Sequence, residues 1–371
     1  MKEPFNICTK CVMDTTDPDI SFNEEGVCDY CSLAEEVMSN YNFSEEEEKK
    51  NLAEMAELIQ KNTGKSGYDS ILGLSGGVDS SYVALLAKEM GLNPLCVHFD
   101  NGWNSEAAVA NINKVIDHCG YELYTYVINW EEFRDLQRSF IKAGVIDLEL
   151  LSDHAIFASL FKLGKEFKIK YVLSGTNFAT ENGLPSSWIW SKMDFRNIKD
   201  IHRKYGSVPL KSFPSMSSFK WGLIRALGIG GTFLEPLNKI NYSKTRAMSK
   251  LESIGWRYYG GKHYESLITK FYQGYILPKK FGVDKRKSHH SALIRNNELT
   301  RDEAINDLKE PPLRIEDLEL EKKFICKKLG FSESEFDEYM NEKPRRHDDF
   351  KTDRYIMQKV TKVAKIFLRK S

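Results

Sequence analysis

Residues 68–91 read YDSILGLSGGVDSSYVALLAKEMG, and this stretch decides how the rest of the chain is interpreted. An apolar segment, 70–74, runs into glycines, an aspartate and serines, and a helical pattern follows at once. Because glycine adopts backbone conformations that other residues avoid, Gly76 and Gly77 allow a sharp turn with bare N–H groups. A helix that begins at this turn directs the positive end of its dipole at the same point. The stretch therefore predicts an anion-binding loop between a strand and a helix.

The polar residues of this loop restrict the ligand. Asp79 would repel a phosphate unless a cation lies between them, so its presence predicts Mg²⁺. The loop lacks the lysine of a Walker A motif and the spacing of a dinucleotide-binding GxGxxG motif. The alternative is a glycine-rich turn that binds no ligand. We predict a phosphate site with Mg²⁺ on Asp79, formed by Ser75, Gly76, Gly77, Val78, Asp79, Ser80 and Ser81.

Strand and helix patterns alternate around the loop. Expected strands cover 70–74, 94–99, 122–128 and 170–174, and expected helices cover 80–90, 105–119, 130–143 and 153–168. Strands that alternate with helices at this spacing form parallel βαβ units. The sequence therefore predicts an α/β fold with a doubly wound parallel sheet. Ligands of such sheets bind beyond the carboxyl ends of the strands, which is where the glycine turn lies.

Four of the seven cysteines form two Cys-x₂-Cys pairs near the start of the chain, Cys8 with Cys11 and Cys28 with Cys31. Each pair can place two thiolates on one tight turn, and two such turns complete a tetrahedron, so we predict a structural, zinc-ribbon-like site. A redox Cys-x₂-Cys motif is the alternative. Plain buried thiols are predicted for the isolated Cys96, Cys119 and Cys326.

Composition narrows the class of protein. The chain has 371 residues, with Lys+Arg and Asp+Glu balanced at 53 each, which argues against a dedicated nucleic-acid binder. No window approaches the about 18–20 apolar residues of a membrane span, and the first residues lack a signal-peptide core, so we expect a cytoplasmic protein without membrane insertion. We divide the chain into a four-cysteine zinc module (1–45), a linking helix (46–66), the domain with the loop (67–238) and a mostly helical C-terminal domain for substrate or partner (239–371).

The SGGVDSS sequence after an apolar strand resembles the PP-loop of the ATP pyrophosphatases, whose fold is similar to that of the adenine-nucleotide α-hydrolases. The resemblance implies that 67–238 binds ATP, adenylates a carbonyl-type oxygen and releases pyrophosphate before a nucleophile displaces AMP. It also implies ATP contacts in the VHFD and LSGTN stretches, for which ordinary buried strand ends are the alternative. These contacts are His98, Phe99, Asp100, Gly175 and Thr176.

The segment CTKCVMDTTDPDISFNEEGVCDYC in front of a PP-loop resembles the N-acetyl sugar amidotransferases of bacterial surface polysaccharides, including lipopolysaccharide O-antigen and pseudaminic- or legionaminic-type acids. Further stretches agree, among them SGTNFATENGLP, GGKHYESLITKFYQGYILPKKFGVDKRKSHHSALI and LTRDEA. The resemblance implies that an N-acetyl group of a nucleotide-linked diacetamido sugar becomes an acetamidino group. The sequence shows no glutaminase pattern, so the resemblance implies a separate glutaminase, with a cyclase-like subunit, as the source of ammonia.

Catalytic candidates follow from the same resemblance. The stretch 279–287, KKFGVDKRK, carries five basic residues in nine, and its Lys285 and Arg286 are expected to reach the β- and γ-phosphates. A solvated basic loop is the alternative. For the other residues that match the family pattern, three roles stay open: binding Mg²⁺, orienting the substrate and transferring a proton. These are Asp153, His154 and Glu181, with His263 and Glu265 of GKHYES.

Two alternative functions stay open. A PP-loop tRNA-modifying enzyme, of thiolase or lysidine type, would share the adenylation step but should carry a basic RNA-binding domain and usually a second pair of cysteines. The balanced charge argues against it. A non-catalytic nucleotide-binding subunit would have no need of Asp79. The basic, helical pattern from Arg345 onward has no assigned function.

Overall fold

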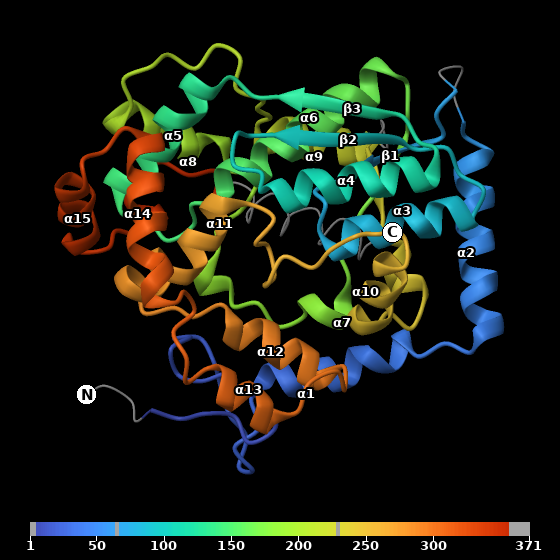
Figure 1. Ribbon diagram of the computed structural model, residues 1–371, viewed down its shortest axis with the longest axis horizontal. Helices are drawn as coiled ribbons and strands as arrows, with labels where there is room; N and C mark the ends of the chain where they lie inside the picture. Colours follow the sequence, from blue (N-terminus) through green and yellow to red (C-terminus); the bar gives the residue numbers. More distant parts are fainter. Residues whose placement is uncertain (1–4, 64–66, 228–230, 356–371) are drawn as a thin grey trace, which may run out of the picture.

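The computed structural model describes residues 5–63, 67–227 and 231–355. Its five-stranded sheet has the order β3-β2-β1-β4-β5, and all paired strands are parallel (Figure 1). The order changes direction at β1, which pairs with β2 on one side and β4 on the other. Loops separate at such a switch point and leave room for a ligand. The strands are β1 (Ser70–Gly73), β2 (Leu95–Asp100), β3 (Leu123–Val127), β4 (Tyr171–Leu173) and β5 (Thr232–Leu234).

Helices follow the strands in the predicted alternation. Two of them begin earlier than the sequence pattern indicates, so that Asp79 and Asp153 lie in the first turns of α3 and α6. The helix before the sheet starts with the capping box that Ser44 and Glu47 form. These helices are α2 (Glu45–Gln60), α3 (Val78–Glu89), α4 (Glu106–Cys119), α5 (Trp130–Ala143), α6 (Leu150–Glu166) and α10 (Lys244–Glu252).

Side chains of β1 alternate between the two faces of the sheet. Leu72 packs in one buried cluster with residues of α2, α3, α4 and α10, among them Val83. Ile71 points to the opposite face and packs with Leu160 and Leu163 of α6. A parallel sheet covered by helices on both faces is a doubly wound α/β fold, so the predicted fold class is confirmed.

The rest of the chain is mostly helical, as predicted. Helices α11, α14 and α15 lie beside the end of the sheet, and α12 with α13 lies in a lower lobe next to α1 and the N-terminal segment (Figure 1). None of the helices in the described ranges is long and apolar enough to cross a membrane. The bounds are α1 (Asp29–Met38), α7 (Phe178–Glu181), α8 (Phe195–Tyr205), α9 (Ser218–Leu227), α11 (Leu267–Phe271), η4 (Tyr272–Phe281), α12 (Arg286–Arg295), α13 (Arg301–Asp307), α14 (Ile315–Leu329) and α15 (Glu333–Asn341).

Two details differ from the sequence prediction. β5 is not among the strands expected from the sequence, because three residues are too few for a strand period. The helix expected from Arg345 onward is wrong for 346–353, where only the short turn His347–Asp349 is helical and backbone groups instead bond to side chains of α8. Residues 356–371, like 1–4, 64–66 and 228–230, lie outside the described residues, and the division into four segments stays a prediction.

The turn after β1 is packed tightly on α4. Gly76 has a φ of +81°, and a Cβ atom on it would lie 2.4 Å from the carbonyl oxygen of Ala108. Its own carbonyl oxygen accepts a hydrogen bond of 3.0 Å from the Trp256 indole N–H and one of 3.4 Å from the Asn111 amide. Only glycine fits here, since both the conformation and the space exclude a side chain.

We therefore expect Gly76→Ala to destabilise the protein by more than the about 1–2 kcal/mol that a left-handed conformation costs an alanine. The matched control is Gly91→Ala, because Gly91 has a similar φ of +66° but no atom within 4 Å of its added Cβ. Thermal unfolding of both variants measures the difference. Equal melting temperatures would contradict the steric part of the argument.

Candidate functional site

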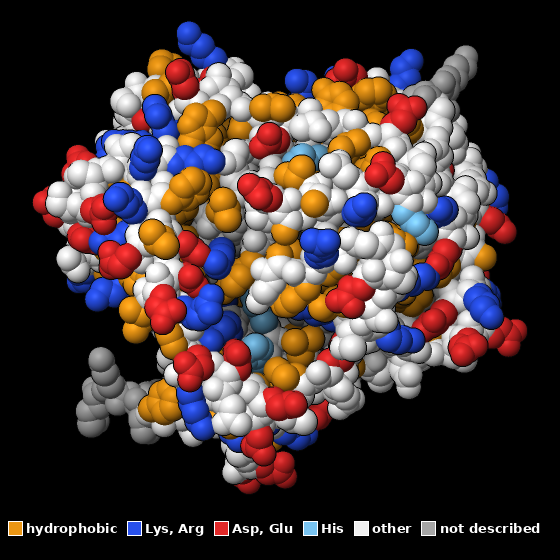
Figure 2. Space-filling model, in the orientation of Figure 1, with side chains coloured by type: hydrophobic (Ala, Val, Ile, Leu, Met, Phe, Trp, Pro, Cys, Tyr) orange, Lys and Arg blue, Asp and Glu red, His pale blue; other side chains and the backbone are white. Residues whose placement is uncertain are grey.

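A cavity of about 770 Å³ lies where the loops after β1 and β4 face α12 and the segment 258–265. Histidine side chains are visible in the hollow between the body of the protein and the lower lobe, on a face where basic and acidic side chains are interspersed (Figure 2). Segments far apart in sequence thus share one site. The predicted residues that line it are Ser75, Gly77, Val78, Asp79, Ser80, Gly175, Thr176, Glu181, His263, Glu265, Lys285 and Arg286.

The loop after β1 presents backbone donors to this cavity. α3 begins at Val78, and no side chain caps its first turn, so these N–H groups are available to an anion. The Ser80 hydroxyl accepts a hydrogen bond of 3.3 Å from the Ser75 N–H. Gly175 lies so close to α3 that a Cβ on it would be 3.0 Å from the Ser80 nitrogen. The loop residues buried behind the lining are Gly76 and Ser81.

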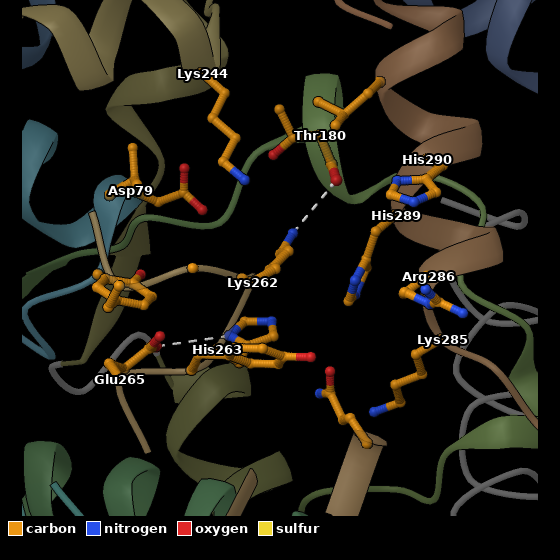
Figure 3. A pocket seen from close by; sticks show the side chains of 18 of the residues that line it. Asp79, Thr180, Lys244, Lys262, His263, Glu265, Lys285, Arg286, His289 and His290 are labelled. Atoms are coloured by element: carbon orange, nitrogen blue, oxygen red, sulfur yellow. Dashed lines mark hydrogen bonds and ion pairs between the residues drawn. The ribbon is translucent and has the colours of Figure 1, made fainter. Parts of the chain in front are cut away.

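Asp79 lies at one side of the cavity with two lysines extending toward the space in front of it (Figure 3). Its carboxylate accepts a hydrogen bond from the Tyr242 hydroxyl. Burial raises the pKa of Asp79, and the charge of Lys262 opposes this rise. The Lys262 ammonium also forms an ion pair of 3.1 Å with Glu181. Burial and the charge of Lys262 lower the pKa of Lys244. The two lysines therefore make this part of the cavity electropositive.

Lys285 and Arg286 line the same cavity, but carboxylates already hold both cations. Lys285 is only 5% exposed and forms an ion pair with Glu149, so a solvated basic loop does not describe it. Arg286 pairs with Asp284 at 2.8 Å and with Asp307 at 3.5 Å. Burial alone would raise the pKa of Glu149, but Lys285 and other nearby cations lower it to about 2. Contact of these two cations with phosphates stays a prediction.

A second cavity, of about 300 Å³, lies beyond the ends of β1 and β2 against α6. Ser75, His263 and Glu265 line both cavities, so the two spaces meet beside the loop. Asp153 forms an ion pair of 3.0 Å with Lys192 at the edge of this space. Burial raises the pKa of Asp153, and the charge of Lys192 opposes the rise. The predicted residues confined to this second cavity are His98, Phe99 and Asp153.

Besides Gly76 and Ser81, two predicted residues line neither cavity. The Asp100 carboxylate accepts hydrogen bonds from the Gly102 N–H at 2.9 Å and the Asn104 amide at 3.1 Å, so it stabilises the turn after β2. His154 is 0% exposed, with Nδ1 2.8 Å from the Lys192 carbonyl oxygen and Nε2 3.2 Å from a backbone nitrogen. Both nitrogens are engaged by the backbone, so His154 holds neighbouring segments together, and a role for it in the reaction stays a prediction.

Sequence reasoning missed several charged residues of the site, among them Lys262, Lys244 and Glu149. Lys262 directly precedes His263 in GGKHYES, so a signal for it was present. Lys244 and Glu149 stand in ordinary helical patterns, where a charged residue is usually part of a solvated face. Only the tertiary structure shows that these two residues belong to the site.

The cysteine pairs converge as a separate, buried cluster. The sulfur atoms of Cys8, Cys11, Cys28 and Cys31 all lie within 4.8 Å of one another. The N–H groups of Cys11 and Cys28 donate to the Cys8 sulfur at 3.4 and 3.3 Å, which is how thiolates are stabilised on tight turns. Four thiolates with such donors fit Zn²⁺, and the ion would fix the fold of this module rather than take part in chemistry.

Arg295 at the end of α12 connects this cluster to the cavity. Its guanidinium nitrogen lies 3.8 Å from the Cys11 sulfur and 3.7 Å from the Cys31 sulfur. The same side chain donates to the Asn182 side-chain oxygen at 2.6 Å and to its carbonyl oxygen at 2.9 Å. Asn182 directly follows α7, whose last residue is Glu181. The cysteine module and the lining of the cavity therefore share a supporting residue.

Comparisons with known proteins agree with this architecture. Residues 71–176 match the asparagine synthase family, and residues 265–364 match the C-terminal domain of the WbpG-like lipopolysaccharide biosynthesis proteins. An uncharacterised protein of Methanocaldococcus jannaschii is 31% identical over 170 residues, which are 45% of this chain and 58% of that protein.

Two solved structures are similar over part of the chain. The NMN synthetase of Francisella tularensis is 16% identical with a TM-score of 0.36, over 58% of this chain and 73% of that one. The NH₃-dependent NAD synthetase of Campylobacter jejuni is 19% identical with a TM-score of 0.29, over 56% of this chain and 83% of that one.

The parallel sheet, the loop after β1 and the match of residues 71–176 to the asparagine synthase family indicate a domain of the PP-loop class. The match of residues 265–364 to the WbpG-like C-terminal domain relates the chain to lipopolysaccharide biosynthesis proteins. Together the two matches support a PP-loop amidotransferase-type role in lipopolysaccharide biosynthesis.

We expect the purified protein to carry about one zinc ion per chain and to lose it in Cys8→Ser, because the remaining three thiolates cannot complete a tetrahedron. The control is Cys326→Ser, since Cys326 is equally buried but isolated from the cluster. Metal analysis of both variants is the measurement. Retention of zinc by Cys8→Ser, or a folded wild-type protein without metal, would show that the cluster is not a zinc site.

Proposed function

We propose that the protein is an ATP-dependent amidotransferase that converts an N-acetyl group of a nucleotide-linked diacetamido sugar into an acetamidino group for a bacterial surface polysaccharide. One observation carries the proposal: an uncapped helix start, Asp79 and cations from the C-terminal half line a single cavity. The two domain matches support the broader role, an ATP-dependent amidotransferase of lipopolysaccharide biosynthesis.

In the proposed reaction, adenosine occupies the second cavity and the β- and γ-phosphates lie over residues 75–80. The amide oxygen of the N-acetyl group attacks the α-phosphorus, a new P–O bond forms, and the bond to pyrophosphate breaks. The loop N–H groups, with Lys244 and Lys262, would stabilise the charge that develops on the leaving pyrophosphate. Lys285 and Arg286 would join them by exchanging carboxylate partners for phosphate oxygens.

Asp79 fits a ligand of Mg²⁺. Its carboxylate stands in an anion-binding turn, and Tyr242 is the hydrogen-bond donor that holds it in place. A hard cation prefers carboxylate and phosphate oxygens, so the ion would offset the repulsion between Asp79 and the nucleotide. Glu181 and Asp153 stay candidates for substrate orientation or for a second contact with the ion.

Ammonia completes the proposed reaction. It attacks the carbon of the O-adenylated amide, a C–N bond forms, and AMP leaves. Because ammonia is the minority form of ammonium at neutral pH, we propose a separate glutaminase, together with a cyclase-like subunit, as its source. Ammonium salts should replace these subunits in vitro.

With ATP, Mg²⁺, ammonium chloride and a nucleotide-linked diacetamido sugar, we expect the protein to release AMP and pyrophosphate in step with acetamidine formation. Chromatography of the nucleotides and mass spectrometry of the sugar measure both products. Release of ADP and phosphate would rule out the adenylation mechanism. A tRNA substrate in place of the sugar tests the alternative class, and adenylation of tRNA would favour it.

Asp79→Asn should lower this turnover by about a hundredfold or more while leaving the melting temperature nearly unchanged, because the neutral amide cannot hold the cation at the phosphates. Asp117→Asn is the matched control, since Asp117 is exposed on α4 and far from the lining. Turnover should be measured across a range of Mg²⁺ concentrations. Wild-type turnover in Asp79→Asn would refute the role of this carboxylate.

A further inference from the structure

His263 lies where three spaces meet. A third cavity, of about 430 Å³, opens between α7 and α12, and its lining includes the uncharged polar side chains of Asn177 and Asn238 with Tyr41. Among the described residues that line these three cavities, His263 is the one common to all of them. Adenylation requires adenosine, pyrophosphate and acceptor to meet at the α-phosphorus. The position of His263 matches that meeting point.

The backbone at His263 is strained. Its φ is +63°, a left-handed conformation that costs a non-glycine residue about 1–2 kcal/mol. Its side chain is nevertheless 41% exposed toward the cavity, so packing of the ring in a core does not explain the conformation. Strain of this kind is found where a structure holds a functional side chain in place.

Glu265 supports the ring from the side of the phosphate loop. The His263 Nδ1 lies 3.7 Å from the Glu265 Oε1, and the same oxygen would be 3.4 Å from a Cβ atom on Gly77. The other oxygen, Oε2, is buried without a hydrogen-bond partner among the described residues. This arrangement places a histidine and its carboxylate directly above the loop that would hold the phosphates.

Of the three histidines that line the first cavity, His290 lies 2.7 Å from Asp307, and the other two have opposite charge preferences. Burial alone would lower the pKa of His263, but Glu265, assisted by Glu149 and opposed by Lys262, raises it above its ordinary value. The neighbouring His289, whose ring centroid is 5.9 Å away, has its pKa held well below the ordinary value by burial and by four surrounding cations. Of the two rings, His263 is therefore the stronger base.

Three carboxylates around the meeting point of the cavities already have partners. Glu181 is paired with Lys262, Glu149 with Lys285, and Asp79 accepts the hydrogen bond of a tyrosine. The pKa of Glu149 is lowered to about 2, so this group is a weak base. A proton released at the meeting point of the three cavities has His263 as its best-placed acceptor.

We propose that His263 accepts the proton that ammonia loses when it attacks the activated amide carbon, a role that rests on the proposed function. The lone pair of ammonia forms the C–N bond, and one proton passes from this nitrogen to the His263 ring. The C–O bond to AMP then breaks, and its electron pair leaves with AMP. The product is an acetamidinium, and Glu265 balances the imidazolium that His263 becomes.

His263→Asn tests the proposal, because asparagine tolerates the left-handed backbone but offers no base. Two rates are measured with ATP, Mg²⁺ and the nucleotide-linked sugar: sugar-dependent exchange of pyrophosphate into ATP, and acetamidine formation from ammonium chloride. We expect exchange to stay within a few-fold of wild type and acetamidine formation to fall about 10²-fold or more. His118→Asn, exposed on α4, is the matched control.

The pH dependence supplies a second readout. At a fixed concentration of free ammonia, the wild-type rate should fall as the pH drops through the raised pKa of His263, and this limb should vanish in His263→Asn. Acetamidine formation at the wild-type rate in the variant, equal loss of both reactions, or an unchanged acidic limb would each overturn the proposal. A wild-type protein that shows no pyrophosphate exchange would overturn the proposed function itself, and the two failures are thereby distinguished.

Discussion

Close backbone packing fixes the turn after β1. Gly76 is pressed against the Ala108 carbonyl on α4, and Gly175 against the first turn of α3. The Trp256 indole, from the C-terminal half, donates to the Gly76 carbonyl. Because three separate segments hold the turn, its N–H groups point at one place before any ligand arrives. A preorganised donor set of this kind loses little energy to reorganisation during a reaction.

The cysteine module contributes to the same rigidity from the opposite side. Arg301 donates to the carbonyl oxygens of Cys8 and Cys11, and Arg295 contacts the sulfur cluster while it binds Asn182. Both arginines lie within residues 265–364, the segment that matches the WbpG-like C-terminal domain. A metal ion that fixes the four sulfur atoms would therefore also fix the position of α7 and Glu181. The first 45 residues would then support the walls of the cavity, although most of the lining comes from other segments.

The sequence predicted the features that depend on local pattern, and the structure supplied those that depend on distant contacts. The strands beside the loop and the cysteine pairs are short-range patterns, which one stretch of chain can reveal. Asp153 and His154 show the limit of such patterns. Adjacent residues on a helix point about 100° apart, so one faces a cavity and the other the core, and composition does not reveal which. The convergence of Glu149, Lys262 and His263 depends on how α6 meets the C-terminal half.

Charge pairing explains how so many ionised groups can share one cavity. Lys262 with Glu181 at 3.1 Å, Lys285 with Glu149, and Arg286 with Asp284 at 2.8 Å are closed pairs, which avoids the high cost of isolated buried charges. A triphosphate can replace the carboxylate in such a pair, because it offers the cation a similar partner. His263 and Glu265, at 3.7 Å, form a looser pair than these. In the proposed reaction the site would therefore separate two tasks: the closed pairs would supply cations to the phosphates, and the looser pair would leave a base for the nitrogen that must lose a proton.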